Sequence, residues 1–144
     1  MTTLRLDTLP PRAVVLPRDE MAFRARYREL LLARTLTTVF RPGDRIYPSW
    51  RGYSPGEIVT ARIICKPGSD ELGVPPKFDD IRIPIRIVGL SVSRLETLGP
   101  DAFLGSSPDV CDGPSLAQHL YEIYGRPVND FGNQVTRIAF VYIA

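Results

Sequence analysis

The sequence predicts an α+β domain built on a curved, largely antiparallel sheet or a small barrel. Apolar residues at helical spacing stand near both ends of the chain, and alternating β-branched segments lie between and after them. Neither an internal repeat nor a strand-helix-strand rhythm is present. The 144 residues, 44% of them hydrophobic and 24% charged, suffice for one core. We therefore expect a single small domain.

The first predicted element is a helix from Asp19 to about Arg34. Asp19 can cap its N-terminus, and four apolar side chains follow at the spacing of one buried helix face. These are Phe23, Tyr27, Leu30 and Leu31. Three arginines share the opposite face, where Glu20 and Glu29 can pair with them. They are Arg24, Arg26 and Arg28. We interpret this charge as a paired, solvated surface rather than as a binding site.

Four strands are predicted after this helix. The first, 36–41, is rich in β-branched and aromatic residues and ends at the turn sequence RPGD. The others span 57–65, 81–92 and 134–143, each with alternating side chains. One face of the second strand is expected to hold Val59, Ala61, Ile63 and Cys65. Pro84 predicts that the third strand is an edge strand or carries a bulge.

Two irregular stretches and a second helix complete the chain. Residues 66–80 read KPGSDELGVPPKFDD, and this composition predicts an insertion or a mobile lid. After another irregular stretch, Ser115 and Gln118 form a capping box that begins a helix, and Gly125 ends it. Its apolar residues are Leu116, Leu120, Ile123 and Tyr124.

Composition excludes several classes of protein. No apolar run approaches the roughly 18 residues that span a membrane, and the first twenty residues lack the apolar core of a secretion signal. We therefore expect a cytoplasmic protein without a membrane partner. Cys65 and Cys111 have neither CxxC partners nor neighbouring histidines, so neither a metal site nor a disulfide is expected. No cofactor is expected either, because phosphate-cradling and dinucleotide-binding motifs are missing from the sequence.

The basic residues are almost all arginines. The net charge is only +2, too small to indicate a nucleic-acid-binding protein by itself, yet sixteen arginines stand against two lysines. Arginine offers a planar fork to phosphate and stacks on bases, which favours nucleic-acid or nucleotide recognition. Genome base composition produces the same excess without any function. The composition alone leaves both explanations open.

The order of motifs resembles a known family. A helix followed by LLARTLTTVFRPGDRI, a strand pair, a short helix near LETLGPDAF, the helix SLAQHLYEIYG and the strand VTRIAFVYI are similar to the ASCH domain, a member of the PUA-like barrel superfamily. The resemblance covers roughly residues 21–143. It implies an N-terminal extension, 1–20, and an ASCH-like domain, 21–144. It also implies a small PUA-like β-barrel with flanking helices, and a cleft that accepts RNA or a modified nucleoside.

The opening junction is the most specific part of the resemblance. The family has Gly-Arg-Lys there, then a Thr-x-Arg strand and a Gly-Asp turn, whereas this chain has Ala33-Arg34-Thr35. Thr37 and Arg41 are expected on one strand face. Hydroxyl and guanidinium groups at the mouth of a barrel could donate to phosphate, sugar or base edges. The alternative is that the threonines are present because they favour a β-strand, and that the charge of Arg34 complements the dipole at the C-terminal end of the helix.

The following segment, DRIYPSWRGYSPGE, interleaves aromatic residues with arginines, as base stacking and phosphate contact require. Its aromatic residues are Tyr47, Trp50 and Tyr53, and its arginines are Arg45 and Arg51. Alternatively, Trp50 fills one end of the barrel core. The candidate ligand-binding residues are thus Arg34, Thr35, Thr37, Arg41, Trp50 and Arg51.

Catalysis is left open by the sequence. Some bacterial ASCH proteins of similar size are amidohydrolases that act on N4-acetylcytidine and pair a lysine and a threonine at the junction with a glutamate. Here Arg34 or Thr35 replaces the lysine, and LGSSPDV stands where the glutamate is expected. Arginine stays protonated and cannot act as a base, so the reaction would need Asp109 and a water molecule. His119 is the sole histidine and is expected at a helix boundary, which leaves no defensible Ser-His-Asp arrangement.

The main functional expectation is therefore an RNA- or nucleotide-binding module with an Arg/Thr/aromatic cleft. Two alternatives stand beside it. One is a nucleoside amidohydrolase or ribonuclease that uses the same cleft, with its catalytic residues unknown. The other is a protein-interaction module that uses residues 66–80 and exposed arginines, and an exposed apolar patch near Phe78 would favour it.

Overall fold

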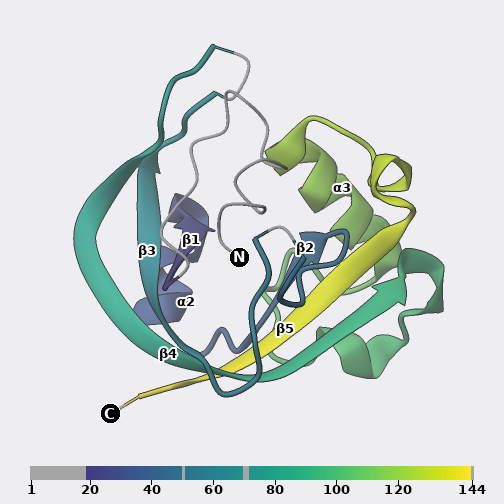
Figure 1. The fold of residues 1–144 in the computed structure, drawn as a ribbon, viewed down its shortest axis with the longest axis horizontal. Coiled ribbons are helices and arrows are strands. Elements are labelled where there is room, and N and C mark those ends of the chain that lie inside the picture. The colour runs from purple at the N-terminus through teal and green to yellow at the C-terminus, as the bar shows by residue number, and fades with distance from the viewer. Residues whose placement is uncertain (1–18, 50, 70–71, 144) are drawn as a thin grey trace.

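The computed structural model describes residues 19–49, 51–69 and 72–143, and in this part the chain forms an α+β fold. Five strands make one curled sheet in the order β1-β3-β4-β5-β2, shaped like half of a barrel (Figure 1). The predicted α+β class and barrel-like sheet are confirmed. The strands are β1 (Glu20–Arg24), β2 (Thr38–Pro42), β3 (Ile58–Lys66), β4 (Lys77–Arg94) and β5 (Gln134–Tyr142). The helices are α2 (Arg28–Leu32) and α3 (Gly113–Tyr124), with 3-10 turns η1 (Ala25–Tyr27), η2 (Leu95–Thr97), η3 (Pro100–Phe103) and η4 (Val128–Phe131).

The prediction of a helix from Asp19 is wrong for residues 20–24. Residues 20–24 form β1, which pairs in parallel with β3, and only η1 and the short α2 are helical. Met21 and Phe23 are buried at a spacing of two, so the apolar pattern also fits a strand. The backbone N–H of Thr60 donates to the carbonyl of Asp19 over 2.7 Å. The free edge of β3 therefore decides the conformation of this segment.

The arginines of this segment find partners other than those predicted. Glu20 pairs with Arg62 at 3.1 Å rather than with Arg24. Arg26 pairs with Asp109 at 3.0 Å. Because β1 is extended, the i,i+4 neighbours of a helix no longer share a face, and contacts with distant segments replace them.

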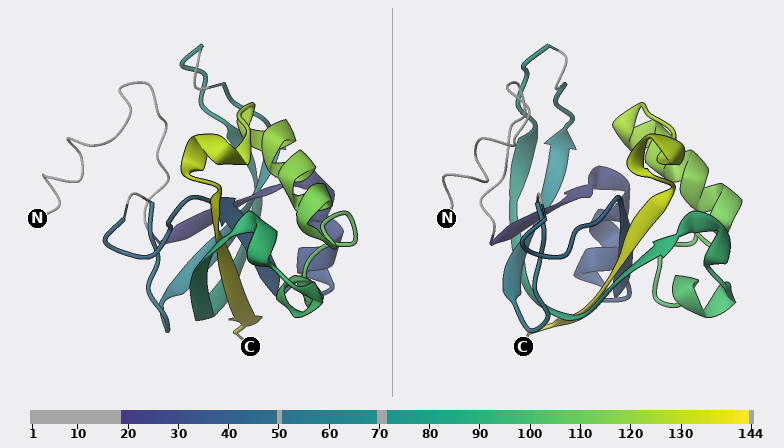
Figure 2. Two further views of the ribbon diagram at one scale, coloured as in Figure 1. Left: turned by 90° about the vertical axis from the view of Figure 1, so that its right-hand side faces the viewer. Right: turned by 45° about the vertical axis from the view of Figure 1, so that its right-hand side comes forward.

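The strand predictions after residue 36 are confirmed within a few residues. Val59, Ala61 and Ile63 are buried as expected, but Cys65 is exposed. The pairing of β3 with β4 shifts between Ile64 and Lys66, where the two strands leave the core. Beyond this point they form an arm that projects from the sheet (Figures 1 and 2).

The expected irregular stretch at 66–80 is wrong at both of its ends. Lys66 belongs to β3 and residues 77–80 belong to β4, and Ser69 bridges to Val74 between them. The segment is thus largely the far end of a β-hairpin. Alternation of inward and outward residues is weak here because no core lies beneath the arm, which explains why the sequence does not read as strand.

Pro84 does not mark an edge strand, because β4 lies between β3 and β5. Its Cα faces Thr60 of β3. The N–H of Thr60 does not need an acceptor on Pro84, because it donates to the carbonyl of Asp19, just before β1. The carbonyl of Pro84 accepts from the N–H of Ile143, just beyond the last β4–β5 pair at Ile85 and Tyr142. The donor that proline lacks therefore falls at the end of a ladder, where its loss matters least.

Helix α3 forms where predicted. Asp112 and Ser115 make a reciprocal capping box, so the cap lies three residues earlier than expected. Gly125 ends the helix in the left-handed conformation, with φ of 67°. Figures 1 and 2 show α3 near η4 and the start of β5, on the opposite side of the molecule from β3.

Two apolar cores lie on the two faces of β2. Val39 packs in the core inside the curled sheet, whereas its neighbour Phe40 packs in a second core under α3. Successive residues of a strand point to opposite faces, so β2 is covered on both sides. Arg41 shares the side of Val39, which directs its guanidinium group into the open side of the half barrel.

Candidate functional site

Arg41 bridges the two edges of the curled sheet. It projects from β2, and its Nη2 atom donates to the backbone carbonyl of Ala22 in β1 over 2.8 Å. The guanidinium carbon also lies 5.7 Å from the centre of the Phe23 ring. No carboxylate of the described residues lies within ion-pair distance of Arg41. The edges of the half barrel are therefore joined by a cation that keeps hydrogen-bonding capacity.

The RPGD turn places a second arginine beside the first. Gly43 has φ of 77°, which suits glycine, and its N–H donates to the carbonyl of Gln134 over 2.8 Å. The hydroxyl of Thr136 then donates to the Gly43 carbonyl over 2.6 Å and accepts from the N–H of Arg45 over 2.8 Å. Arg45 is only 7% exposed. The turn is thus fastened to β5, and the side chain of Arg45 is held in the interior.

The loop after this turn folds back on Arg45. The N–H of Tyr53 donates to the Arg45 carbonyl over 2.8 Å, and the N–H of Tyr47 donates to the Tyr53 carbonyl over 2.9 Å. Arg51, at the bend of this loop, adopts φ of 57°. The buried Tyr53 joins the core inside the curled sheet. Arg45 and Tyr53 of the interleaved segment therefore meet just beyond the end of β2.

Three guanidinium groups converge on two phenols at this place. Burial acts to raise the pKa of Tyr124, but Arg41, Arg45 and Arg51 outweigh it and hold that pKa below its usual value. Burial raises the pKa of Tyr53, although Arg41 and Arg45 act in the opposite direction. We call these residues the arginine-tyrosine site. They are Arg41, Arg45, Arg51, Tyr53 and Tyr124.

This site is suited to binding rather than to proton transfer. Guanidinium groups stay protonated at neutral pH and donate to phosphate or carboxylate in a fixed geometry. Tyrosine rings offer faces for stacking, and their hydroxyl groups offer further donors. The arrangement therefore suits a ligand that combines negative charge with a planar ring.

Arg34 lies elsewhere. It follows α2 with φ of 61°, and its guanidinium carbon is 5.9 Å from the centre of the Tyr142 ring. Burial raises the pKa of Tyr142 to about 12, and Arg34 opposes this shift only in part. The Tyr142 hydroxyl donates to the carbonyl of Leu36 over 2.6 Å. Of the two junction arginines, only Arg41 thus lies where its charge acts to lower the pKa values of Tyr53 and Tyr124.

The threonines of the junction donate to backbone carbonyls, locally from Thr35 and over a long sequence separation from Thr37 and Thr38. The hydroxyl of Thr35 donates to the Leu30 carbonyl over 3.3 Å. Thr37 lies just before β2, and its N–H donates to the carbonyl of Gly105 over 2.9 Å. The hydroxyl of the buried Thr38 donates to the Leu104 carbonyl over 2.8 Å, in line with a structural role. Trp50 lies outside the described residues.

A second polar cluster joins α3 to η1. The hydroxyl of Tyr27 lies 3.1 Å from Nδ1 of His119 and 3.3 Å from Oδ2 of Asp109. Nη1 of Arg26 donates to the same carboxylate oxygen over 3.0 Å. We call Arg26, Tyr27, Asp109 and His119 the His119 cluster. It links three segments that are far apart in the sequence.

Burial governs the electrostatics of the His119 cluster. It lowers the pKa of His119 and raises that of Tyr27, so both are neutral at pH 7. Burial also acts to raise the pKa of Asp109, but hydrogen bonds from Ser107 and Arg26 outweigh it and keep that carboxyl ionised. His119 is 8% exposed, and Tyr27 and Ser107 are buried as well. His119 is therefore an interior residue rather than the boundary residue predicted.

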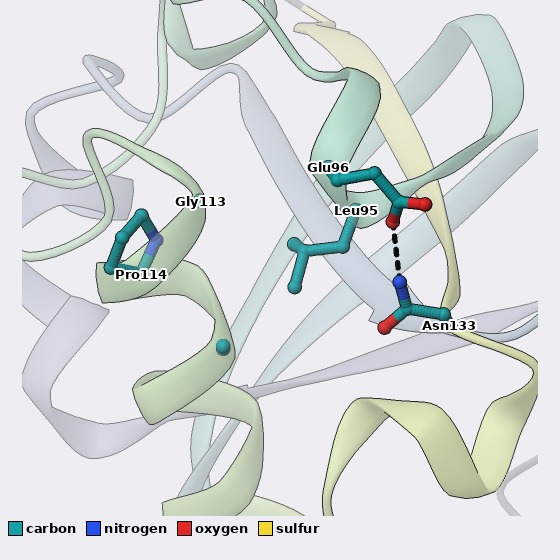
Figure 3. A pocket seen from close by; sticks show the side chains of 6 residues that line it. Leu95, Glu96, Gly113, Pro114 and Asn133 are labelled. Carbon is teal, nitrogen blue, oxygen red and sulfur yellow. Dashed lines mark hydrogen bonds between the residues drawn. The ribbon is translucent and has the colours of Figure 1, made fainter.

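A shallow hollow of about 260 Å³ lies between η2 and the first turn of α3. Figure 3 shows Leu95 and Pro114 on two sides of it, while Glu96 and Asn133 share a hydrogen bond at its rim. Its remaining lining residues are Gly113 and Ala117. None of the predicted ligand-binding residues contributes to it, and its walls are largely apolar.

Among the described residues, no group of three His, Cys, Asp or Glu side chains could hold a metal ion. Both cysteines are exposed thiols. No helix in the described part of the chain is long and apolar enough to cross a membrane.

The fold and site define a small half-barrel protein with a cationic, aromatic interior site. No protein-family model and no curated protein matches the chain. A solved structure described as "Crystal structure of hypothetical protein PH0355" is similar, with a TM-score of 0.56 and 18% sequence identity. The likeness covers 86% of this chain and 97% of that one. At this identity it shows a shared fold and nothing further.

Arg45 and Tyr124 were not among the predicted ligand-binding residues. Arg45 stands in the interleaved segment, so the pattern that indicated Arg51 also contained it. Tyr124 had no such signal, because at helical spacing it reads as one more apolar residue of α3. Its role emerges only when the C-terminal end of α3 lies beside the turn after β2.

Proposed function

We propose that the arginine-tyrosine site binds a nucleotide unit, either within RNA or as a free nucleotide or modified nucleoside. The observation that carries the proposal is the Arg41 bridge between the two sheet edges, beside Arg45 and Tyr53, which a backbone hydrogen bond joins. Arg41, Arg45 and Arg51 also hold the pKa of Tyr124 below its usual value. Guanidinium groups recognise phosphate, and tyrosine rings stack on bases. A nucleotide combines these two features in one ligand.

The chain topology supports the same proposal. A helical turn, a strand ending in RPGD, a curled sheet and a late helix agree with an ASCH-like domain of the PUA-like superfamily, the family that the sequence resembles. We propose that the chain is such a module. In this reading the ligand enters between β1 and β2, the two sheet edges that Arg41 joins.

The enzymatic alternative receives less support. Asp109, the residue that would replace the missing glutamate, contacts Arg26 and Tyr27 in the His119 cluster rather than the arginine-tyrosine site. An amidohydrolase or ribonuclease acting at this site would then need a base from elsewhere. A protein-interaction role would use the β3–β4 arm, where Leu72 is 79% exposed.

Titration with uridine 5′-monophosphate and a fluorescein-labelled tetrauridylate tests the proposal. We expect Arg41→Gln and Arg45→Gln each to weaken both ligands about tenfold, because each removes charge-assisted hydrogen bonds. Arg82→Gln is the matched control, since Arg82 is an exposed arginine on the outer face of β4. Thermal melts must show that each variant is folded.

Equal losses for Arg82→Gln and Arg41→Gln would indicate diffuse charge attraction and contradict the site. No binding of either ligand by the parent protein at low salt would overturn the proposed function. In that case a peptide or protein partner for the β3–β4 arm becomes the alternative to test.

A further inference from the structure

A line of two aromatic side chains and one arginine leads outward from the arginine-tyrosine site. The Tyr124 ring contacts the ring of Phe131, with centroids 6.3 Å apart and planes at 68°. The guanidinium carbon of Arg126 lies 5.0 Å from the centre of the Phe131 ring. Tyr124 ends α3, Arg126 lies just before η4, and Phe131 ends η4.

The position of Phe131 ties this line to the RPGD turn. A side-chain carbon placed on Gly43 would lie 3.8 Å from the Phe131 ring, in ordinary contact distance. Gly43 belongs to the turn that holds Arg45 beside β5. Phe131 therefore stands at the border between the enclosed arginine-tyrosine site and the outer surface of η4.

Arg126 is available to a ligand at this surface. Its side chain is 59% exposed, and its ion pair with Asp130 spans 3.3 Å between neighbouring turns of the same segment. Exposed pairs of this kind contribute little and are screened by salt, so a phosphate group can replace the carboxylate. The guanidinium plane is also a surface on which a base can stack.

From this geometry we infer that the ligand is a single-stranded oligonucleotide, and that Phe131 and Arg126 form a second nucleotide subsite outside the first. The inference rests on the proposed function, because it assigns the first nucleotide to the arginine-tyrosine site. A mononucleotide would leave the outer pair unused. A strand of several nucleotides places one base against Phe131 and a neighbouring phosphate against Arg126.

The length of the ligand tests this inference. We expect tetrauridylate to bind about tenfold more tightly than uridine 5′-monophosphate, because one further stacked base contributes about 1 to 3 kcal/mol, or roughly five- to 150-fold in affinity. Phe131→Leu, which keeps an apolar side chain against Gly43, should remove most of this difference. Neither it nor Arg126→Gln should change the affinity for the monophosphate.

Salt dependence separates the two outer residues. Arg126→Gln should reduce the slope of log affinity against log salt for tetrauridylate by about 0.7, the value for one phosphate contact on a single strand. Phe131→Leu should leave that slope nearly unchanged. Arg94→Gln is the matched control, because Arg94 is also 59% exposed and pairs with a nearby carboxylate, that of Glu96.

The outcomes distinguish the two proposals. If neither ligand binds, the proposed function itself fails. If the monophosphate binds but tetrauridylate is no tighter, or if Arg94→Gln lowers the slope as much as Arg126→Gln, the second subsite is refuted and the first remains. A tetradeoxyuridylate of equal affinity would extend the ligand class to single-stranded DNA at the same subsites.

Discussion

The two polar groups of residues along α3 differ in how their charges are balanced. In the His119 cluster, Arg26 faces Asp109 at 3.0 Å and Glu122 at 3.9 Å, and two neutral buried side chains complete it. In the arginine-tyrosine site, Arg41, Arg45 and Arg51 lower the pKa of Tyr124, and Glu57 acts with burial to raise the pKa of Tyr53. The first cluster is organised around the carboxylate of Asp109. In the second, arginines outnumber the carboxylates that act on the two phenols.

This difference assigns different roles to two parts of one helix. Tyr27 and His119 are buried and lie within hydrogen-bond distance of each other, and such a contact fixes neighbouring segments. A cluster in which arginines predominate attracts anions. His119 therefore fastens α3 to the half barrel, and Tyr124, a little more than one turn later, belongs to the site for which we propose a ligand.

Removal of the Tyr27 hydroxyl should have the largest effect on stability. In Tyr27→Phe the buried His119 and the carboxylate of Asp109 lose a hydrogen-bond partner, so the free energy of unfolding should fall by about 1 to 2 kcal/mol. Affinity for uridine 5′-monophosphate should not change. Urea unfolding and a binding titration on the same sample check both statements. A loss of affinity without a loss of stability would reverse the roles assigned to the two clusters.

The same substitution at Tyr124 should act in the opposite way. Tyr124→Phe keeps the ring that contacts Phe131 but removes the hydroxyl that Arg45 contacts. We expect affinity for the monophosphate to fall about fivefold, near 1 kcal/mol, because Arg45 is less well positioned. The loss of stability should be smaller than in Tyr27→Phe, since Tyr124 is half-buried. Equal destabilisation by Tyr27→Phe and Tyr124→Phe would contradict the separate roles of the His119 cluster and the arginine-tyrosine site.

A smaller effect is expected from pH. Burial lowers the pKa of His119 in the folded protein below the value of about 6.5 in the unfolded chain. Between these two values the unfolded chain binds more protons, so the stabilisation is complete above about pH 6.5 and is lost as the pH falls toward the folded pKa. Asp109, at 4.0 Å, compensates part of the imidazolium charge and limits the loss. Positive charges on Arg24, Arg26 and Arg41 act against protonation.

Urea unfolding at several pH values between about 5 and 7.5 measures this dependence. His119→Gln should flatten the curve in this range, and the parent protein should be less stable at the acidic end. An equal slope in the variant would show that another group is responsible. The titration of Asp109 lies in a lower range, because its folded pKa is below its usual value.

The sequence by itself determined most of the sheet and the late helix. The Ile81–Ile87 alternation, the segment before RPGD and the capping box at Ser115 are local signals whose physical causes act within a few residues. Arg41 and Arg51 were singled out as candidate ligand-binding residues by their place beside a turn and beside aromatic residues. For the sheet and the helix, the neighbours in the chain supply the signal.

Only the tertiary structure decided the rest. Residues 20–24 fit a helix or a strand equally well by their apolar spacing, and the parallel edge of β3 selects the strand. Tyr27 of η1 and His119 of α3 meet although 92 residues separate them in the chain. Tyr124 approaches the turn after β2 because α3 packs its apolar face against Phe40. Contacts of this kind depend on how distant elements pack together, and the spacing of residues along the chain does not predict that packing.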